Sequence, residues 1–468
     1  MLRPVRRKYA PKDFDAWAYN IWWPQDQPIS PLTEKVGFVV EDIKFAYNAW
    51  CLLRLAMFFG VKHPKILSSM VNTTPSMDIM LAGNRLFYMH SRVEAHLNPE
   101  KVRIALTPNH PRAFPIQQFC WEKHCTQYRP DATGVELVLG MENGLSKTIA
   151  DACDHCTYIP QYGSIGSLSM LSALAIAAHT MSRSLRKENQ PLLTSDGESK
   201  APSCGHMPLS NNPRPDRSSL PHEADLLYCS NEEIKQILLK RRETYKLQLS
   251  VMIYNQLGDR NIGAVIRNAN AFNCEHVVIV NRKRFNRRGA LSTQKVLDIR
   301  FFETIYEDNA RTLLDGYEIW LLYPYYTNLL IYDADVDSSN ALQSSTFLRH
   351  EDPLLNAWKA SQHRLTAQHP LLRAHPHLAR DPVFLDDNQS LTSAVWEVKR
   401  KRLRGIMLAV PEEGCSPHPS FAHICHRLVY VSTPTLLPHK TQRGLNPALS
   451  TAISFERIRS TIDALHVP

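Results

Sequence analysis

The apolar and polar positions of the chain form a pattern that occurs twice. Apolar runs at 36–40 (VGFVV) and 249–254 (LSVMIY) predict buried β-strands. Each precedes a mainly apolar segment that predicts a helix, AYNAWCLLRLAMFFG at 46–60 and DRNIGAVIRNANAFN at 259–273. A further short strand is expected after each helix, around PKIL and HVVIV. Strand, helix and strand in this order predict a βαβ unit with a parallel sheet in each half.

A constant offset relates the two segments and predicts an internal duplication. Asn48 aligns with Asn261 (261 − 48 = 213), and Arg54 aligns with Arg267 at the same offset. Three further pairs follow it: Phe59 with Phe272, His63 with His276, and Ile66 with Ile279. Each half therefore carries an Asn and an Arg, six residues apart, within an otherwise apolar helix.

The later parts of the halves also match. The first half continues as VELVLGMENGLSKTIADACDHCTYIP and QYGSIGSLSMLSALAIAAH, and the second as RGIMLAVPEEGCSPHPSFAHICHRLVYVSTP and TQRGLNPALSTAISFERI. Each predicts a strand, an acidic turn, a helix, a short strand, a loop and a final helix. Glu142 aligns with Glu412 at an offset of 270, and Ser169 with Asn446 at 277. The increase in the alignment offset from 213 to 270 predicts an insertion in the second half, and we place it at about 336–390.

A change in amino-acid composition marks the boundary between the two halves of the chain. Residues 183–225 are rich in Ser, Pro, Asn and charge and predict a flexible linker. Ser230 and Glu233 predict a capping box for the helix that follows. The expected organisation is an α/β chain with a basic extension at 1–34, a first domain at 35–182, the linker at 183–225, and a second domain at 226–468 that contains the insertion.

Charge and hydropathy narrow the classes of function. No apolar run approaches the roughly 18 residues of a membrane span, so no membrane association is expected. The net charge of +9 and the pI near 9.0 favour a polyanionic partner such as nucleic acid. Two basic segments support this expectation, RKRFNRR at 282–288 and KRKRLR at 399–404, although charge runs are usually solvated faces.

The cysteines and the charge of the N-terminal residues indicate the cellular compartment of the protein. Ten cysteines without a disulfide-like rhythm favour a reducing compartment. The pair Cys153 and Cys156 has no second ligand pair nearby, so no metal site is expected. The first twelve residues carry five basic and no acidic side chains, which is typical of a transit segment.

The duplicated Asn and Arg suggest a polar binding site. An Arg at the end of a parallel sheet, beside an Asn and a turn with available N–H groups, suits a phosphate or ribose. An ion pair or helix cap is the structural alternative. In the turn GMENGLS, Gly140 and Gly144 allow close backbone approach to a flat ligand. An ordinary strand-to-helix turn, with Glu142 near a helix N-terminus, explains the same residues.

Three ordered motifs together resemble the SpoU/TrmH family of SPOUT RNA methyltransferases. They are Asn-x5-Arg after a strand, LVLG-x-E-x-GLS, and IP-x-x-G followed by a SLN-like helix. The resemblance covers most of both halves and implies two tandem α/β domains, each with a trefoil knot that forms an S-adenosylmethionine (SAM) pocket. It implies methylation of ribose 2′-hydroxyls in rRNA or tRNA. Because family members resemble obligate dimers, the duplicated chain is expected to be an intrachain pseudo-dimer.

The resemblance also assigns roles to residues. The polar catalytic set it implies is Asn48, Arg54, Glu142, Asn261, Arg267 and Asn446. The SAM-binding set it implies is Gly140, Glu142, Gly144, Ile159, Gly163 and Leu168.

Departures from the family pattern leave two interpretations open. Met141 and Ser169 replace family asparagines, Trp50 stands where the second half has Gly263, and Pro411 replaces the first glycine of the second donor turn. In one interpretation the first half holds SAM while the second presents Arg267 to the ribose of an rRNA. In the other, both sites are degenerate and the protein is a large-subunit ribosome assembly factor. In both, the expected partners are rRNA and the assembling ribosome, with further protein partners, in mitochondria or otherwise in the cytoplasm.

Overall fold

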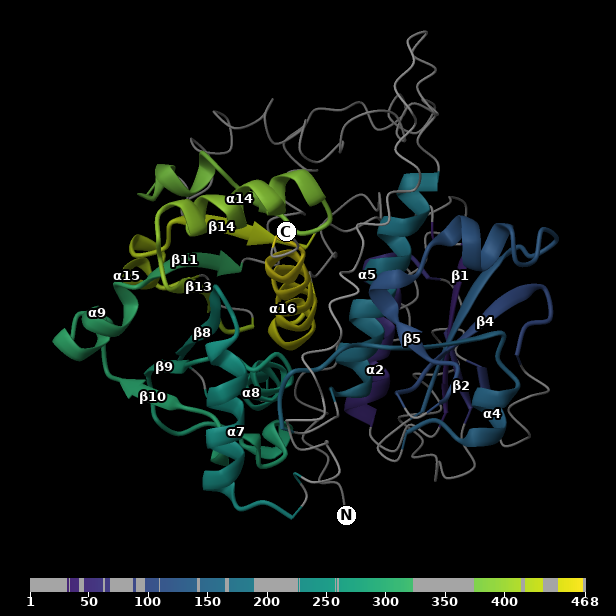
Figure 1. Cartoon of the computed structure of the whole chain (residues 1–468), viewed down its shortest axis with the longest axis horizontal. Coiled ribbons are helices and arrows are strands. Elements are labelled where there is room, and N and C mark those ends of the chain that lie inside the picture. The colour runs from purple at the N-terminus through teal and green to yellow at the C-terminus, as the bar shows by residue number, and fades with distance from the viewer. Residues whose placement is uncertain are drawn as a thin grey trace, which may run out of the picture. The chain divides into compact units, whose positions relative to one another are not determined.

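The computed structural model contains two compact units, each with its own parallel sheet (Figure 1). Unit 1 comprises 1–159, 177–188 and 433–443, and unit 2 comprises 160–176, 189–432 and 444–468. The structure describes residues 32, 34–41, 46–61, 64–67, 87–89, 97–108, 110–140, 144–164, 168–188, 226, 228–256, 258, 261–322, 374–413, 417–431 and 445–465.

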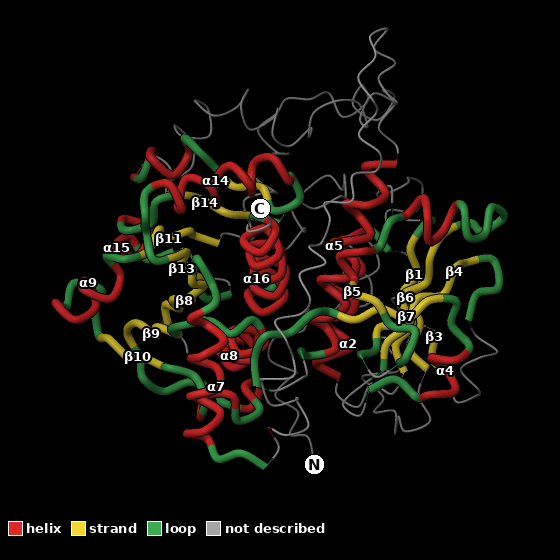
Figure 2. The backbone as a smooth tube through the Cα atoms, viewed as in Figure 1, coloured by secondary structure: helices red, strands yellow, loops and turns green. Residues whose placement is uncertain are grey.

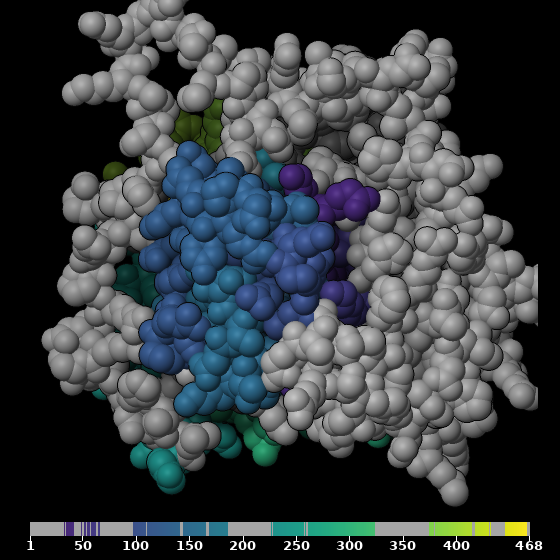
Figure 3. Space-filling model, turned by 90° about the vertical axis from the view of Figure 1, so that its right-hand side faces the viewer, coloured from purple at the N-terminus to yellow at the C-terminus, as the bar shows by residue number. Residues whose placement is uncertain are grey.

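Unit 1 is built on a parallel sheet with the strand order β3-β2-β1-β6-β4-β7-β5. Its strands are β1 (Val36–Glu41), β2 (Lys65–Leu67), β3 (Phe87–Met89), β4 (Lys101–Leu106), β5 (Phe114–Pro115), β6 (Gly134–Leu139) and β7 (His155–Tyr158). Its helical elements are α2 (Ala46–Phe59), η3 (Ile116–Gln118), η4 (Glu122–Thr126) and α4 (Lys147–Asp151), together with most of α5 (Met170–Glu188). In Figure 3, blue residues of this unit, from the range 97–188, form one continuous surface.

Unit 2 repeats this order of strands as β10-β9-β8-β13-β11-β14-β12. Its strands are β8 (Gln248–Asn255), β9 (Val277–Asn281), β10 (Ile299–Phe302), β11 (Tyr317–Leu322), β12 (Val383–Phe384), β13 (Gly405–Val410) and β14 (Arg427–Tyr430). Its helical elements are α7 (Asn231–Glu243), α8 (Asn261–Ala271), η5 (Arg288–Ala290), η6 (Thr293–Lys295), α9 (Asp308–Leu314), η8 (Pro376–Ala379), α14 (Asn388–Arg400), α15 (Pro419–His423) and α16 (Pro447–Ala464). Figure 2 shows the strands of each unit gathered beside their helices.

The strand register confirms the duplication predicted from the sequence. Val40 of β1 pairs with Ile66 of β2, and Ile253 of β8 pairs with Ile279 of β9, so both pairs differ by 213 positions. All strand pairs in both sheets are parallel, as predicted. The central strands β6 and β13 are buried along their whole length, which explains their continuous apolar sequence. The trefoil knot and the pseudo-dimer stay predictions.

The register also locates the insertion. Lys101 and Tyr317 take equivalent positions at an offset of 216, whereas Phe114 and Val383 take equivalent positions at 269. The repeat therefore gains 53 residues (269 − 216) between the end of β11 and the start of β12. Residues 374–390, the last part of the predicted insertion, contribute η8, β12 and the start of α14. The rest of the predicted insertion lies outside the described residues.

Where the structure describes the ends of helices, the interactions found there agree with those predicted from the sequence. The side chain of Ser230 accepts from the Glu233 N–H, and the Glu233 carboxylate accepts from the Ser230 N–H, which confirms the predicted capping box. The first residues of the predicted linker, 183–188, end helix α5. Most of the basic extension and the rest of the linker lie outside the described residues. Within the described part, no helix has the length and apolar character needed to cross a bilayer.

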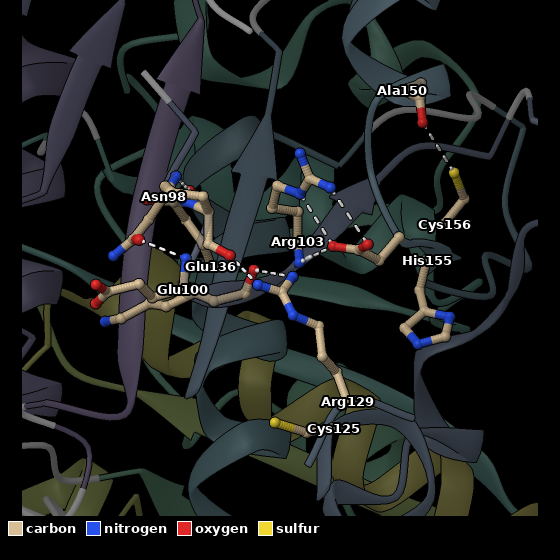
Figure 4. Close-up of polar contacts among 12 residues, drawn as sticks. Asn98, Glu100, Arg103, Cys125, Arg129, Glu136, Ala150, His155 and Cys156 are labelled. Atoms are coloured by element: carbon tan, nitrogen blue, oxygen red, sulfur yellow. Dashed lines mark hydrogen bonds and ion pairs between the residues drawn. The ribbon is translucent and has the colours of Figure 1, made fainter. Parts of the chain in front are cut away.

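Each unit buries a carboxylate within its sheet. In unit 1, Glu136 accepts from Lys65 Nζ at 2.9 Å. It also accepts from the Asn98 N–H at 2.8 Å, and Figure 4 shows Asn98 beside Glu136. In unit 2, Glu318 is 1% exposed at its side chain and accepts from Lys401 Nζ at 2.7 Å and Arg427 Nε at 2.6 Å. A buried carboxylate is tolerated only when such donors replace water.

A second polar pair of unit 1 lies at the start of its strands. Arg103 donates through its Nε to Asp154 Oδ2 at 3.0 Å, and the same carboxylate accepts from the Arg103 N–H at 2.8 Å (Figure 4). Burial alone would raise the pKa of Asp154, but these hydrogen bonds outweigh it and lower the pKa. The pair therefore fixes the start of β7 beside β4, at the end of the sheet away from the predicted site.

Candidate functional site

Helix α8 follows the carboxyl end of β8 and carries two residues of the predicted polar site. Asn261 is its first residue, Arg267 lies six residues later, and Gly263 lies between them in the first turn. A side chain at Gly263 would approach the carbonyl oxygen of Asn286 to 2.8 Å and the N–H of Gly289 to 3.1 Å. Glycine at this position therefore lets the basic loop after β9 pack against α8.

Arg267 contacts a residue predicted to bind SAM. Its Nη2 donates to the carbonyl oxygen of Leu168 at 3.2 Å, and both residues belong to unit 2. The sequence placed Arg267 in the second repeat and Leu168 in the first. The structure brings these two residues together, and it assigns residues 160–176 to unit 2, whereas the sequence placed them in the first domain.

The described residues 162–164 and 168, which we call the docking segment, make several further contacts with α8. The N–H groups of Tyr162 and Gly163 donate to the carbonyl oxygen of Ala271, at 2.7 and 3.2 Å. Asn270 Nδ2 donates to Ser164 Oγ at 3.0 Å. These bonds align the docking segment with the last turn of α8.

Asn261 and the two acidic residues after β13 form a polar cluster at the carboxyl end of the sheet. Asn261 Nδ2 donates to Glu413 Oε2 at 2.7 Å, and Glu412, which is 4% exposed, accepts from the Gln256 N–H at 2.6 Å. Leu139 of β6 and Val410 of β13 share a register position at an offset of 271. Counting onward from these strands brings Glu142 to the position of Glu413 instead of Glu412. Glu142 itself lies outside the described residues.

Asn446 caps the last helix. Its Oδ1 accepts from the Leu449 N–H at 2.9 Å, and the side chain is buried. Ser169 takes the same role at the start of α5, where its Oγ accepts from the Ser172 N–H at 3.1 Å. Since Ser and Asn are both good N-caps, the departure of Ser169 from the family pattern preserves the cap. The capping interaction is thus a structural reason for Asn446, separate from any catalytic role.

The corresponding residues of the first repeat lie in unit 1. Asn48 and Arg54 are both in helix α2, which follows β1 as α8 follows β8, and both are partly exposed. The turn after β6 is held by Glu41, whose Oε2 accepts from the Ser146 N–H at 3.1 Å. Ile159, directly after β7, is buried.

The predicted SAM-binding residues divide between the units. Gly140, Gly144 and Ile159 belong to unit 1, whereas Gly163 and Leu168 belong to unit 2. A Cβ at Gly140 would lie 2.2 Å from the carbonyl oxygen of Gly144, and a Cβ at Gly163 would lie 1.8 Å from the carbonyl oxygen of Asn270. Backbone packing therefore gives both positions a structural reason to be glycine, and their role toward SAM stays a prediction.

The two predicted RNA-binding segments differ in their surroundings. In 282–288 all five basic side chains are exposed, and the segment follows the carboxyl end of β9, beside α8. In 399–404, Lys401 pairs with Glu318, and Arg404 donates to Glu275 at 2.8 Å, at the amino end of the sheet. The first segment is thus exposed and lies beside α8, while part of the second serves the fold.

Cys153 and Cys156 are buried thiols in unit 1. Burial raises the pKa of Cys153 to about 12, and Cys156 Sγ donates to the Ala150 carbonyl. A protonated thiol is a poor metal ligand. In the part of the chain that the structure describes, no cluster of three or more His, Cys, Asp or Glu side chains has the arrangement of a metal site.

Comparison with known proteins gives matches among solved structures alone. No family model and no curated protein matches the sequence. A probable methyltransferase from Bordetella pertussis Tohama I is 21% identical, with a TM-score of 0.28 over 33% of this chain and 95% of its own. The A. aeolicus TrmH/SpoU tRNA modifying enzyme is 16% identical, with a TM-score of 0.28 over 33% and 77%. A SpoU methyltransferase from Streptomyces viridochromogenes, in complex with the cofactor AdoMet, is 18% identical, with a TM-score of 0.25 over 33% and 61%.

Over about a third of its length, the chain is structurally similar to SpoU/TrmH methyltransferases.

Sequence reasoning missed several residues around the candidate site. Glu413 could have been found by counting from the two aligned strands. Tyr162, Tyr245 and Arg459 gave no signal, because their importance depends on contacts between distant parts of the chain.

Proposed function

We propose that this chain is an RNA-binding protein related to SpoU/TrmH methyltransferases, with its RNA site in unit 2. The observation that carries the proposal is the position of helix α8. Through Arg267, α8 contacts the docking segment, and through Gly263 it contacts the exposed basic loop 282–288. A positively charged loop beside a sheet-end Arg is suited to a phosphodiester backbone.

The reaction we propose is SAM-dependent methylation of a ribose 2′-hydroxyl of rRNA. When bound, SAM would supply the methyl group as an electrophile. Arg267 is protonated at neutral pH, so its role would be to orient the ribose phosphate and stabilise charge, not to remove a proton. Asn261 donates a hydrogen bond to the carboxylate of Glu413. This carboxylate is a hydrogen-bond acceptor beside α8, the helix that carries Arg267.

The closed positions at Gly140 and Gly163 favour a second candidate function. If backbone fills the donor cradle, the chain would bind rRNA as a ribosome assembly factor without methyl transfer. The proposed location is the mitochondrion, supported by the basic first twelve residues. Imaging of the full chain carrying a C-terminal tag tests the location independently of activity.

One experiment separates the two candidates. Calorimetry of the full chain with SAM and with S-adenosylhomocysteine is followed by methyl incorporation into rRNA and tRNA fragments. Binding of SAM and incorporation into rRNA support the enzyme. Salt-sensitive rRNA binding without SAM binding supports the assembly factor, and the absence of both refutes the proposed function.

A further inference from the structure

A buried arginine lies among aromatic rings where the docking segment meets α7 and α16. The Arg459 side chain is fully buried, and its guanidinium carbon lies 4.2 Å from the ring centre of Tyr245 and 5.7 Å from that of Tyr162. In the part of the chain that the structure describes, its Nε and both Nη atoms have no hydrogen-bond acceptor. Burial of an unpaired charge is costly, and aromatic faces are the compensation visible here.

The same rings fix the docking segment to its surroundings. Tyr162 lies 6.3 Å from the ring of Phe272 and 6.3 Å from that of Tyr245, and its hydroxyl donates to Asp463 Oδ2 at 2.9 Å. Arg241 of α7 donates to the carbonyl oxygens of Tyr162 and Gly163, at 3.4 and 3.1 Å. Three helices of unit 2 thus hold the beginning of the segment whose end contacts Arg267.

The repeat-related positions do not offer the residues for an equivalent second cluster. At the offset of 277 that relates α16 to α5, Arg459 corresponds to Ser182. At the offset of 213, Tyr245 corresponds to Leu32. At the offset of 272 shared by β7 and β14, Tyr162 corresponds to Pro434. The cation and both aromatic rings are therefore specific to one of the two repeat positions.

We propose that Tyr162, Tyr245 and Arg459 form a one-sided cation–π clamp that fixes the docking segment on α8. Arg459 is a positioning residue: it acts through Tyr162, and so holds the Leu168 carbonyl at Arg267. This functional consequence rests on the proposed function, whereas the clamp itself rests on the contacts alone.

The test measures hydrogen exchange of the full chain at the amides of residues 162–164, where the N–H groups of Tyr162 and Gly163 donate to Ala271. Arg459→Met removes the cation, and Arg459→Lys restores a positive charge. Arg457→Met is the matched control, because Arg457 is also buried on α16 but donates to Leu385 and Asn388 instead. Tyr162→Ala removes the ring from the segment and leaves α16 unchanged, in case Arg459→Met does not fold.

We expect exchange at 162–164 to rise at least tenfold in Arg459→Met and Tyr162→Ala, the ratio that corresponds to about 1.4 kcal/mol. Arg459→Lys should recover part of the protection, while Arg457→Met and the amides of β13 should stay unchanged. Unchanged protection in Tyr162→Ala, or an equal rise in Arg457→Met, would overturn the clamp. Wild-type protein that binds neither SAM nor RNA, with the expected exchange pattern, would refute the proposed function and leave the clamp standing.

Discussion

Arg267 of the second repeat donates a hydrogen bond to the carbonyl oxygen of Leu168 from the first repeat, 99 residues earlier in the chain. A guanidinium has five N–H donors, so an arginine can serve a carbonyl oxygen and a phosphate at the same time. This relationship leads to the first prediction, which compares Arg267 with Arg54.

Arg267→Ala should reduce methyl incorporation into rRNA by roughly 100-fold, the scale for losing one preorganised charged donor. Arg54→Ala should change it less than about threefold, on the composite-site interpretation in which only Arg267 faces the ribose. Single-turnover incorporation with labelled SAM makes the comparison. Equal losses in the two variants would contradict the asymmetry, and Arg267→Lys tests whether the forked geometry matters beyond charge.

Gly163→Ala should destabilise the docking segment, because its Cβ would lie 1.8 Å from the Asn270 carbonyl oxygen. The expected loss is about 1–3 kcal/mol of unfolding free energy, the usual cost of overpacking. Urea unfolding measures it. Gly37→Ala is the control, since its Cβ would meet Glu136 at 3.5 Å, an ordinary contact. Similar unfolding free energies for the two variants would show that the segment accommodates the added methyl group without loss of stability.

The basic loop after β9 should carry the salt dependence of RNA binding. Replacing Arg287 and Arg288 with Ala should weaken rRNA binding and reduce the slope of log K against log salt by about 1 for each phosphate that the loop no longer neutralises. Lys399→Ala with Arg400→Ala is the matched control, because both are exposed but precede β13 at the other end of the sheet. A larger effect from the control pair would move the RNA site away from α8.

Asn446→Ala should cost about 1 kcal/mol of stability, because the cap on the Leu449 N–H is removed, whereas Asn446→Ser should cost little. Denaturant unfolding gives both values. If Asn446 also acts in catalysis, Asn446→Ser will keep its stability and lose activity. Retained activity in the serine variant would confine Asn446 to its capping role.

Unit 2 should lose stability in acid through Glu318. Burial by itself would raise the pKa of this carboxyl, but hydrogen bonds from Lys401 and Arg427 outweigh it, so the folded-state pKa lies below 4.5. A depressed pKa contributes stability above about pH 4.5 that is lost as the pH falls through the folded-state value. Glu318→Gln should therefore flatten the fall in melting temperature below pH 4.5, and an unchanged pH profile would contradict this.

The parts of the fold that follow from local pattern were predictable. Buried parallel strands have continuous apolar sequences, so VGFVV and LSVMIY identified β1 and β8, and the fixed spacing from Val40 to Ile66 carried the strand register with it. The capping box at Ser230 is equally local. In these cases the residues that decide the structure lie within one or two elements of each other.

The site was predictable only in part, because its contacts join distant segments. The motif spacing identified Arg267 and Leu168, but no spacing shows that Asn270 presents its carbonyl to Gly163. Sequence reasoning attributed that glycine to a ligand, while the structure attributes it to backbone contact with α8. In the same way, Lys401 looked like part of a basic RNA surface, although its partner Glu318 lies 83 residues away.

The docking segment imposes an order on the folding of the chain. The last strand of the first sheet ends at Tyr158, so that sheet is complete in the nascent chain before the linker is translated. Tyr162, four residues later, bonds to Asp463, 301 residues further along the chain. Contacts of such long separation form late, because the intervening chain must first be made and then brought back. Helix α16 thus decides when a loop that was synthesised about 300 residues earlier takes its final place.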